Sequence, residues 1–255
     1  MKSLSVILAI ILSLCITCNQ KSPNNTMCQE SDTSIIIPLA PKDAEPIILN
    51  RPLNDNDIDS FMTYRTPESF KNLVIRYGKA DTMNELLFYS IVAADKFKMS
   101  RGYYNIAGCI TNYFSYMSIG NYSTEIAVHY LIKGLNNKDK SCLEVYESLD
   151  KHLEKEIGKL WIPEKHKENP IVVYKANSLK GNIDDYNQLK KYLIEKDKPE
   201  DLLFYSYIMA DRYGYEPARN DVVDAMNRGY KKYKLGKLGK DAKYFCSFFQ
   251  EKHEN

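Results

Sequence analysis

A five-residue stretch occurs twice in this 255-residue chain. Leu86–Ser90 and Leu202–Ser206 both read Leu-Leu-Phe-Tyr-Ser, and their flanks stay in register, so that Asp95 corresponds to Asp211 at the same spacing of 116 residues (202 minus 86). Similarity at one fixed spacing is typical of repeat architectures, in which each supersecondary unit buries its apolar face against a neighbour. The sequence therefore predicts stacked repeat units rather than a fold built around a single enzyme pocket.

The segments around both copies have the spacing of amphipathic helices. A further helix is expected to begin after Met99-Ser100 in the first copy and after Tyr215-Glu216-Pro217 in the second, where Pro217 suits the first turn of a helix. Gly102 and Ala218 occupy equivalent places in these helices, and such small residues allow two helix backbones to approach closely. Alternating strand patterns bounded by turn residues are nearly absent, so the predicted class is all-α.

Residues 127–133 (Ala-Val-His-Tyr-Leu-Ile-Lys) and the following Cys142 lie in a predicted helical hairpin with a turn at residues 136–138. This hairpin resembles the tetratricopeptide superfamily, and in particular its Sel-one-like branch. The matching residues are Ala127, Tyr130, Leu131, Lys133 and Cys142, whereas Lys138 stands where the family has its turn glycine. The resemblance implies an α-solenoid of helical hairpins that binds proteins on its concave face. We expect two related repeat units, residues 51–162 and 171–255, joined by a proline-bracketed linker, residues 163–170.

The N-terminus has the pattern of an export signal. Lys2 precedes an apolar run from Leu4 to Ile16 that is too short for a transmembrane helix. The end of this run resembles a bacterial lipoprotein signal peptide, although Cys15 replaces the usual Leu and Thr17 the usual small residue. The resemblance implies removal of residues 1–17, acylation of Cys18 with chains such as palmitate, and anchoring to a membrane of the cell envelope, on the periplasmic side or the cell surface. Cleaved soluble export and a retained membrane anchor are the alternatives.

Residues 18–50 are rich in Ser, Asn, Pro and Asp. Such a composition cannot bury enough apolar surface to fold alone, so these residues are expected to form an extended tether between the lipid and the helical domain. An alternative for the apolar residues 34–37 is docking on the domain as an edge strand.

The sequence contains no recognisable motif for catalysis, metal binding or cofactor binding. Asp55, Asp57 and Asp59 alternate as in a calcium loop, but Ser60 and Thr66 stand where that loop needs glycine and glutamate. The start of a helix at Asp57 or Asp59 is the preferred interpretation, since carboxylates are stabilised near a helix N-terminus. No catalytic residue, metal or cofactor is therefore predicted.

Two pairs of residues allow both a structural and a chemical interpretation. The equivalent residues Asp95 and Asp211 are expected to make a helix-end hydrogen bond that recurs with the fold, in preference to forming two functional carboxylates. Cys109 and Cys142 could pair across neighbouring helices in an exported protein, but buried free thiols are the favoured interpretation.

Two sets of residues are candidates for a binding surface. The chain contains 20 tyrosines, whose apolar rings and polar tips suit interfaces, with packing in the repeat core as the alternative. A basic stretch near the end of the second copy could attract acidic partners or anionic lipid headgroups, although a solvated helix face is the favoured interpretation. The candidate residues are Tyr103, Tyr104, Tyr113, Tyr116, Tyr207, Lys231, Lys232 and Lys234.

The expected function is the binding of another protein or peptide, for example by an immunity or adaptor lipoprotein. Nucleic acid is not an expected partner, because the formal net charge of this exported chain is only +2. The alternatives are an envelope enzyme with dispersed catalytic residues, such as a cell-wall hydrolase, and a structural role in a larger assembly.

Overall fold

The computed structural model describes residues 47–48, 55–79, 85–111, 120, 122–143, 145–146, 160–161 and 169–250. These residues all lie within one unit of the chain, Ile37–Asn255. The predicted signal peptide, the lipidation site Cys18, the tether apart from residues 47–48, and most of the predicted linker lie outside the described residues.

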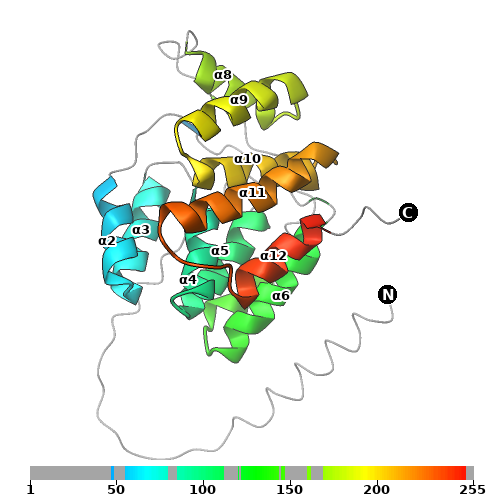
Figure 1. The fold of residues 1–255 in the computed structure, drawn as a ribbon. Helices are drawn as coiled ribbons and strands as arrows, with labels where there is room; N and C mark the ends of the chain where they lie inside the picture. The colour runs from blue at the N-terminus through cyan, green and yellow to red at the C-terminus, as the bar shows by residue number, and fades with distance from the viewer. Residues whose placement is uncertain are drawn as a thin grey trace, which may run out of the picture. The chain divides into compact units, whose positions relative to one another are not determined.

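The regular secondary structure of the described residues is helical apart from one short pair of parallel strands, which confirms the prediction of an all-α class. β1 (Ile47–Ile48) pairs with β2 (Leu160–Trp161), and two-residue strands are too short to leave an alternating pattern in the sequence. The helices, shown in Figure 1, are α2 (Asp55–Tyr64), α3 (Pro67–Lys79), α4 (Leu86–Asp95), α5 (Ser100–Ile110), α6 (Ser123–Asn136), α8 (Pro170–Ser178), α9 (Ile183–Glu195), α10 (Pro199–Asp211), α11 (Glu216–Lys232) and α12 (Lys240–Gln250).

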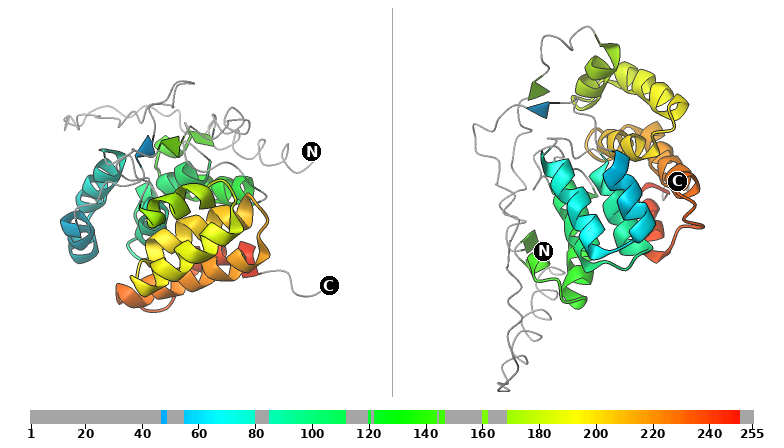
Figure 2. Two further views of the ribbon diagram at one scale, coloured as in Figure 1. Left: turned by 90° about the horizontal axis from the view of Figure 1, so that it is seen from above. Right: turned by 90° about the vertical axis from the view of Figure 1, so that its left-hand side faces the viewer.

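Helices α4 and α10 are buried along their whole lengths. Each contains a copy of the repeated Leu-Leu-Phe-Tyr-Ser stretch, and apolar residues on all sides of a helix are typical of a helix surrounded by protein. α4 and α10 contact each other, α4 also contacts α12, and α10 lies between α9 and α11 (Figure 2). The sequence predicted one apolar stripe on each of these two helices, whereas the neighbouring helices cover every side of them.

Helices in the two halves of the chain begin at similar separations within the described residues. The first residues of α3 and α9, Pro67 and Ile183, are 116 residues apart, and so are their last residues, Lys79 and Glu195. The starts of α5 and α11 are also 116 residues apart, while the starts of α2 and α8 are separated by 115 residues and those of α6 and α12 by 117. The starts of α4 and α10 are 113 residues apart, so five pairs of helices among the described residues lie within three residues of the 116-residue spacing.

Several local predictions are confirmed. α5 begins at Ser100 and α11 at Glu216, within two residues of the predicted starts, and Pro217 lies in the first turn of α11 as predicted. The predicted turn at residues 136–138 follows the end of α6. The three aspartates lie at a helix start as predicted, but α2 begins at Asp55, two residues before the earlier predicted start. Asp57 forms an ion pair with Arg76 of α3 at 3.2 Å.

Gly102 lies where α5 crosses α4 at close range. A Cβ atom at this position would lie 2.7 Å from the backbone nitrogen of Ala94 and 2.9 Å from the backbone oxygen of Ser90. Because both of these atoms belong to the backbone of a fully buried helix, a methyl group can be accommodated only if α4 and α5 move apart.

We therefore expect Gly102→Ala to lower the free energy of unfolding by about 1–3 kcal/mol, the usual cost of overpacking a core, despite the better helix propensity of alanine. Chemical denaturation measures this change. Lys191→Ala on the exposed surface of α9 is the control and is expected to have little effect. A Gly102→Ala protein as stable as the parent would show that the two helices separate without cost.

Asp95 joins the end of α4 to the start of α12. Its carboxylate accepts hydrogen bonds from the backbone N–H groups of Gly239 (2.9 Å), Asp241 (2.9 Å) and Ala242 (3.3 Å). The hydroxyl of Tyr230 donates a fourth bond at 2.7 Å. A helix N-terminus leaves its first N–H groups without partners, and a carboxylate both satisfies them and interacts favourably with the helix dipole.

Asp211 makes the corresponding connection in the opposite direction, from the end of α10 to the start of α6. It accepts hydrogen bonds from the backbone N–H of Tyr122, at 2.6 Å, and from the hydroxyl of Ser123. Desolvation by burial raises the pKa of Asp211 above its usual value, and these hydrogen bonds oppose that shift. The prediction that Asp95 and Asp211 make a repeated helix-end hydrogen bond is thus confirmed. Each aspartate also binds the start of a helix in the other half of the chain.

Candidate binding surface

The tyrosines predicted to form a binding surface are buried wherever the structure describes them. Tyr103, Tyr104 and Tyr207 have exposed fractions of 6%, 2% and 1%. The ring of Tyr103 stacks on Tyr130, and the hydroxyl of Tyr207 is hydrogen-bonded to Ser123. The surface prediction is therefore wrong for these three residues, because their rings fill the spaces between helices, as in the core-packing alternative. Tyr113 and Tyr116 lie outside the described residues.

The three predicted lysines differ in their surroundings. Lys231 and Lys234 are exposed. Lys232 is half-buried, and its ammonium group donates to both carboxylate oxygens of Glu200, at 2.9 and 3.2 Å. Lys232 is thus engaged within the fold, while the other two lysines belong to the solvated surface.

A line of half-buried aromatic side chains runs over α6 and α12, and we call it the aromatic ladder. His129 of α6 stacks on Tyr244 of α12, with ring centroids 3.5 Å apart. Tyr244 packs edge-on against Phe248 at 5.2 Å, and Phe248 lies 6.1 Å from Tyr122, which precedes α6. All four residues are half-buried, so each ring presents one part to the core and another to the surface. Aromatic rings in this position are typical anchors of protein interfaces.

Lysines surround two buried carboxylates beside the aromatic ladder. Asp95 and Asp241 are 2% and 3% exposed. Lys133 forms an ion pair with Asp241, Lys98 lies 3.8 Å from the same carboxylate, and Lys96 lies 3.9 Å from that of Asp95. Two further lysines, Lys237 and Lys240, are exposed in the loop before α12 and in its first turn. We call Lys96, Lys98, Lys133, Lys237 and Lys240 the lysine rim.

His129 connects the aromatic ladder with the lysine rim. Burial lowers the pKa of the His129 imidazole to about 4, and the positive charges of Lys133 and Lys240 contribute, while Asp241 opposes them. His129 is therefore neutral near pH 7, and the local positive charge is carried by the lysines.

Three carboxyl groups meet near the starts of α4 and α10. Burial raises the pKa of Glu85 to about 8, with a further contribution from the charge of Asp201. One oxygen of Asp201 is buried without a hydrogen-bond partner, and the other lies 3.7 Å from the Lys175 ammonium group. Glu200 is better satisfied, since it also accepts a hydrogen bond from Tyr233 at 3.1 Å. Glu85 thus retains its proton near pH 7, which limits the repulsion within this carboxyl cluster.

Cys109, Cys142 and Cys246 are buried free thiols, which confirms the favoured interpretation of the first two. Burial raises the pKa of Cys142 and of Cys246 to about 12, and it raises that of Cys109 further. Since the thiolate is the reactive form of cysteine, these three residues serve packing.

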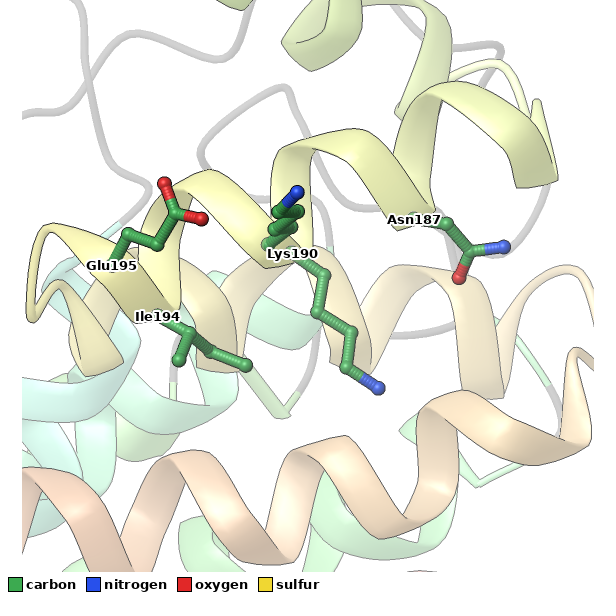
Figure 3. A pocket seen from close by; sticks show the side chains of 5 residues that line it. Asn187, Lys190, Ile194 and Glu195 are labelled. Carbon is green, nitrogen blue, oxygen red and sulfur yellow. The ribbon is translucent and has the colours of Figure 1, made fainter.

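A hollow of about 420 Å³ lies on the surface of α9. Figure 3 shows its lining side chains, which include Asn187, Lys190, Ile194 and Glu195, all projecting from that single helix. The Lys190 ammonium group is engaged in an ion pair with Asp221 of α11 at 2.5 Å. Within the part of the chain that the structure describes, no cluster of three His, Cys, Asp or Glu residues fits a metal ion, and no helix is long and apolar enough to cross a membrane.

The aromatic ladder was not predicted from the sequence, although part of its pattern is visible there. Lys240, Tyr244 and Phe248 follow one another at intervals of four residues, so all three share one face of α12. Their partners His129 and Tyr122 lie more than a hundred residues earlier, and only the tertiary fold brings them together.

Comparisons with known proteins gave no match: no family model matches the sequence, and neither the search of curated proteins nor that of solved structures found a significant similarity.

Proposed function

We propose that this chain is an envelope-tethered helical-repeat protein that binds another protein or peptide through the face formed by α6 and α12. The observation that carries this proposal is the aromatic ladder. Its four rings are half-buried in one continuous line, and the guanidinium group of Arg219 lies 5.6 Å from the ring of Tyr122 at one end. Aromatic residues and arginine supply most of the binding energy in protein interfaces.

The architecture that we propose consists of two related repeat units, as the sequence repeat predicts, but closed on each other instead of extended as an open solenoid. The recurring helix order supports the two units. The bonds of Asp95 to α12 and of Asp211 to α6 support the closure, because in an open solenoid each helical hairpin contacts only the hairpins next to it in sequence. Under this proposal the binding face is built by the last helix of each unit, in place of the concave surface implied by the tetratricopeptide resemblance.

Export and lipidation at Cys18 belong to the same proposal and are supported by the N-terminal sequence. Mass spectrometry of the protein purified from membranes tests them, because acylation adds two or three fatty-acyl chains to the new N-terminus and Cys18→Ser removes them. A mature protein that begins at another residue, or that lacks acyl chains, would rule out this anchor.

The binding proposal predicts that Tyr244→Ala combined with Phe248→Ala abolishes capture of a partner. The tagged full-length protein would be purified from gently solubilised envelopes of its source, and the bound proteins would be identified and quantified. A stoichiometric partner that the double variant loses supports the proposal, because truncation removes the apolar anchors from the α12 face.

Tyr64→Ala is the matched control, since Tyr64 is a 70% exposed tyrosine at the end of α2, outside the aromatic ladder. Circular dichroism and thermal unfolding establish that each variant is folded. A partner retained by the double variant would place the interface elsewhere. Cleavage of cell-wall material by the protein, without any partner, would favour an enzyme.

A further inference from the structure

We propose that the partner segment is acidic and amphipathic, with carboxylates that contact the lysine rim and apolar side chains that pack on the aromatic ladder. This inference rests on the proposed function, since it specifies the chemistry of the ligand for the same face.

The lysine rim has an excess of positive charge. Three of its five ammonium groups pair with the carboxylates of Asp95 and Asp241, and both carboxylates also accept hydrogen bonds within the protein. The charge of Asp95 is directed to three backbone N–H groups and the Tyr230 hydroxyl, while Asp241 also accepts a hydrogen bond from Tyr103. One exposed carboxylate, Glu125 of α6, offsets part of this excess.

Three rim lysines are held in place before any partner binds. Lys96 donates to the backbone oxygen of Lys237, Lys98 donates to that of Asp95 at 2.6 Å, and Lys133 is paired with Asp241. A positioned ammonium group loses less side-chain entropy on binding than a free one, which increases affinity. Preorganised charges of this kind favour a segment with carboxylates at defined places over a diffuse anionic surface.

The charged and apolar parts of the surface have a fixed spacing. Lys240, Tyr244 and Phe248 follow one face of α12 at intervals of four residues, which corresponds to about 6 Å per step along the helix axis. Lys240 lies beside His129 at one end of the aromatic ladder, and Phe248 extends the ladder toward Tyr122. The surface therefore fits a segment whose carboxylates precede or follow its apolar side chains by one or two helical turns.

The test uses the full-length protein and two fluorescein-labelled peptides that differ only in charge. The acidic peptide places glutamates one and two helical turns from a leucine and tryptophan face, and the second peptide has lysine at each glutamate position. Fluorescence anisotropy should show binding of the acidic peptide alone, and added salt should weaken it by screening the charges.

Two sets of charge reversals localise the contact. Lys237→Glu with Lys240→Glu is expected to weaken binding of the acidic peptide at least about tenfold, equivalent to about 1.4 kcal/mol. Lys191→Glu with Lys196→Glu, at exposed positions of α9 and of the turn that follows it, makes the same change in net charge and should leave binding unchanged. Circular dichroism would establish that both variants are folded, and the salt dependence of the unmodified protein tests the charge requirement without any substitution.

The opposite results would overturn the inference. Equal binding of both peptides, or equal loss in both charge-reversed proteins, would show that the lysine rim does not select acidic ligands. Binding of phosphatidylglycerol vesicles without binding of the acidic peptide would identify an anionic membrane as the ligand. If the partner captured from envelopes depends on Tyr244 and Phe248 but still binds the Lys237→Glu, Lys240→Glu protein, the proposed function stands and this inference fails.

Discussion

Replacement of Asp95 with alanine is expected to lower the free energy of unfolding by about 4 kcal/mol, because it removes four hydrogen bonds to a buried charge and leaves their donors without partners. The donors are the Tyr230 hydroxyl and three N–H groups at the start of α12. Water cannot replace the carboxylate easily, since the Asp95 side chain is fully buried. The loss should also free α12 from α4, and with it one side of the proposed binding face.

Urea denaturation measures the free energies of unfolding of Asp95→Ala, of the parent and of the control Asp224→Ala. Asp224 is 45% exposed and forms an ion pair with Arg228 one turn along α11, a contact that stabilises a helix by only about 0.3–0.5 kcal/mol. A loss below about 1 kcal/mol for Asp95→Ala would contradict the role assigned to this carboxylate. Tyr230→Phe removes one donor alone and should cost about 1 kcal/mol, which would separate the tyrosine from the backbone donors.

The role of Asp95 was predictable from the sequence only in part. Recurrence of Asp95 and Asp211 within a repeat correctly indicated a helix-end hydrogen bond. The helices that they cap could not be identified, because a spacing of 116 residues specifies which positions are equivalent but not whether the two copies lie in line or face each other. That choice depends on packing between α4, α10 and α12, which no local pattern encodes.

The candidate site was predictable only in part. A tyrosine suits a surface and a core equally well, so the sequence could not separate Tyr103 and Tyr207, which are buried, from Tyr244, which is half-buried. The spacing of residues along α12 is a better indication of surface exposure, because Lys240, Tyr244 and Phe248 share a face with exposed polar residues of that helix. The charges that surround Asp241 come from α6 and from the turn after α4, and their meeting is a property of the fold.

Glu85 is expected to make the stability of the protein fall as the pH rises from about 4.5 to about 8. The pKa of Glu85 is raised from 4.5 in an unfolded chain to about 8 in the folded protein. Between these values the unfolded state releases the proton while the folded state keeps it, so each increase in pH favours unfolding. A shift of this size corresponds to a loss on the order of 3 kcal/mol after allowance for relaxation of the carboxyl cluster.

Glu85→Gln tests this expectation, because glutamine keeps the shape and neutrality of the protonated acid and has no proton to release. Its stability should match that of the parent near pH 4.5 and exceed it by about 3 kcal/mol above pH 8. Glu195→Gln, at an exposed position at the end of α9, provides a control whose stability should follow that of the parent throughout. Equal pH profiles for the parent and Glu85→Gln would show that Glu85 ionises in the folded protein as it does in water.

Ionisation of His129 changes the stability in the opposite direction over part of the same pH range. Comparison of the parent with Glu85→Gln removes this contribution. The pKa of His129 is lowered from 6.5 to about 4, so the unfolded state takes up a proton first and stability falls as the pH drops through this window. The parent alone would therefore show a shallow profile between about pH 4.5 and 6.5, where the two slopes oppose each other. Subtracting the parent profile from that of Glu85→Gln cancels the His129 contribution, provided that the two sites are independent, as their positions at the start of α4 and within α6 indicate. The remaining curve measures the proton held between α4 and α10, and hence how strongly the central helix pair depends on keeping Glu85 neutral.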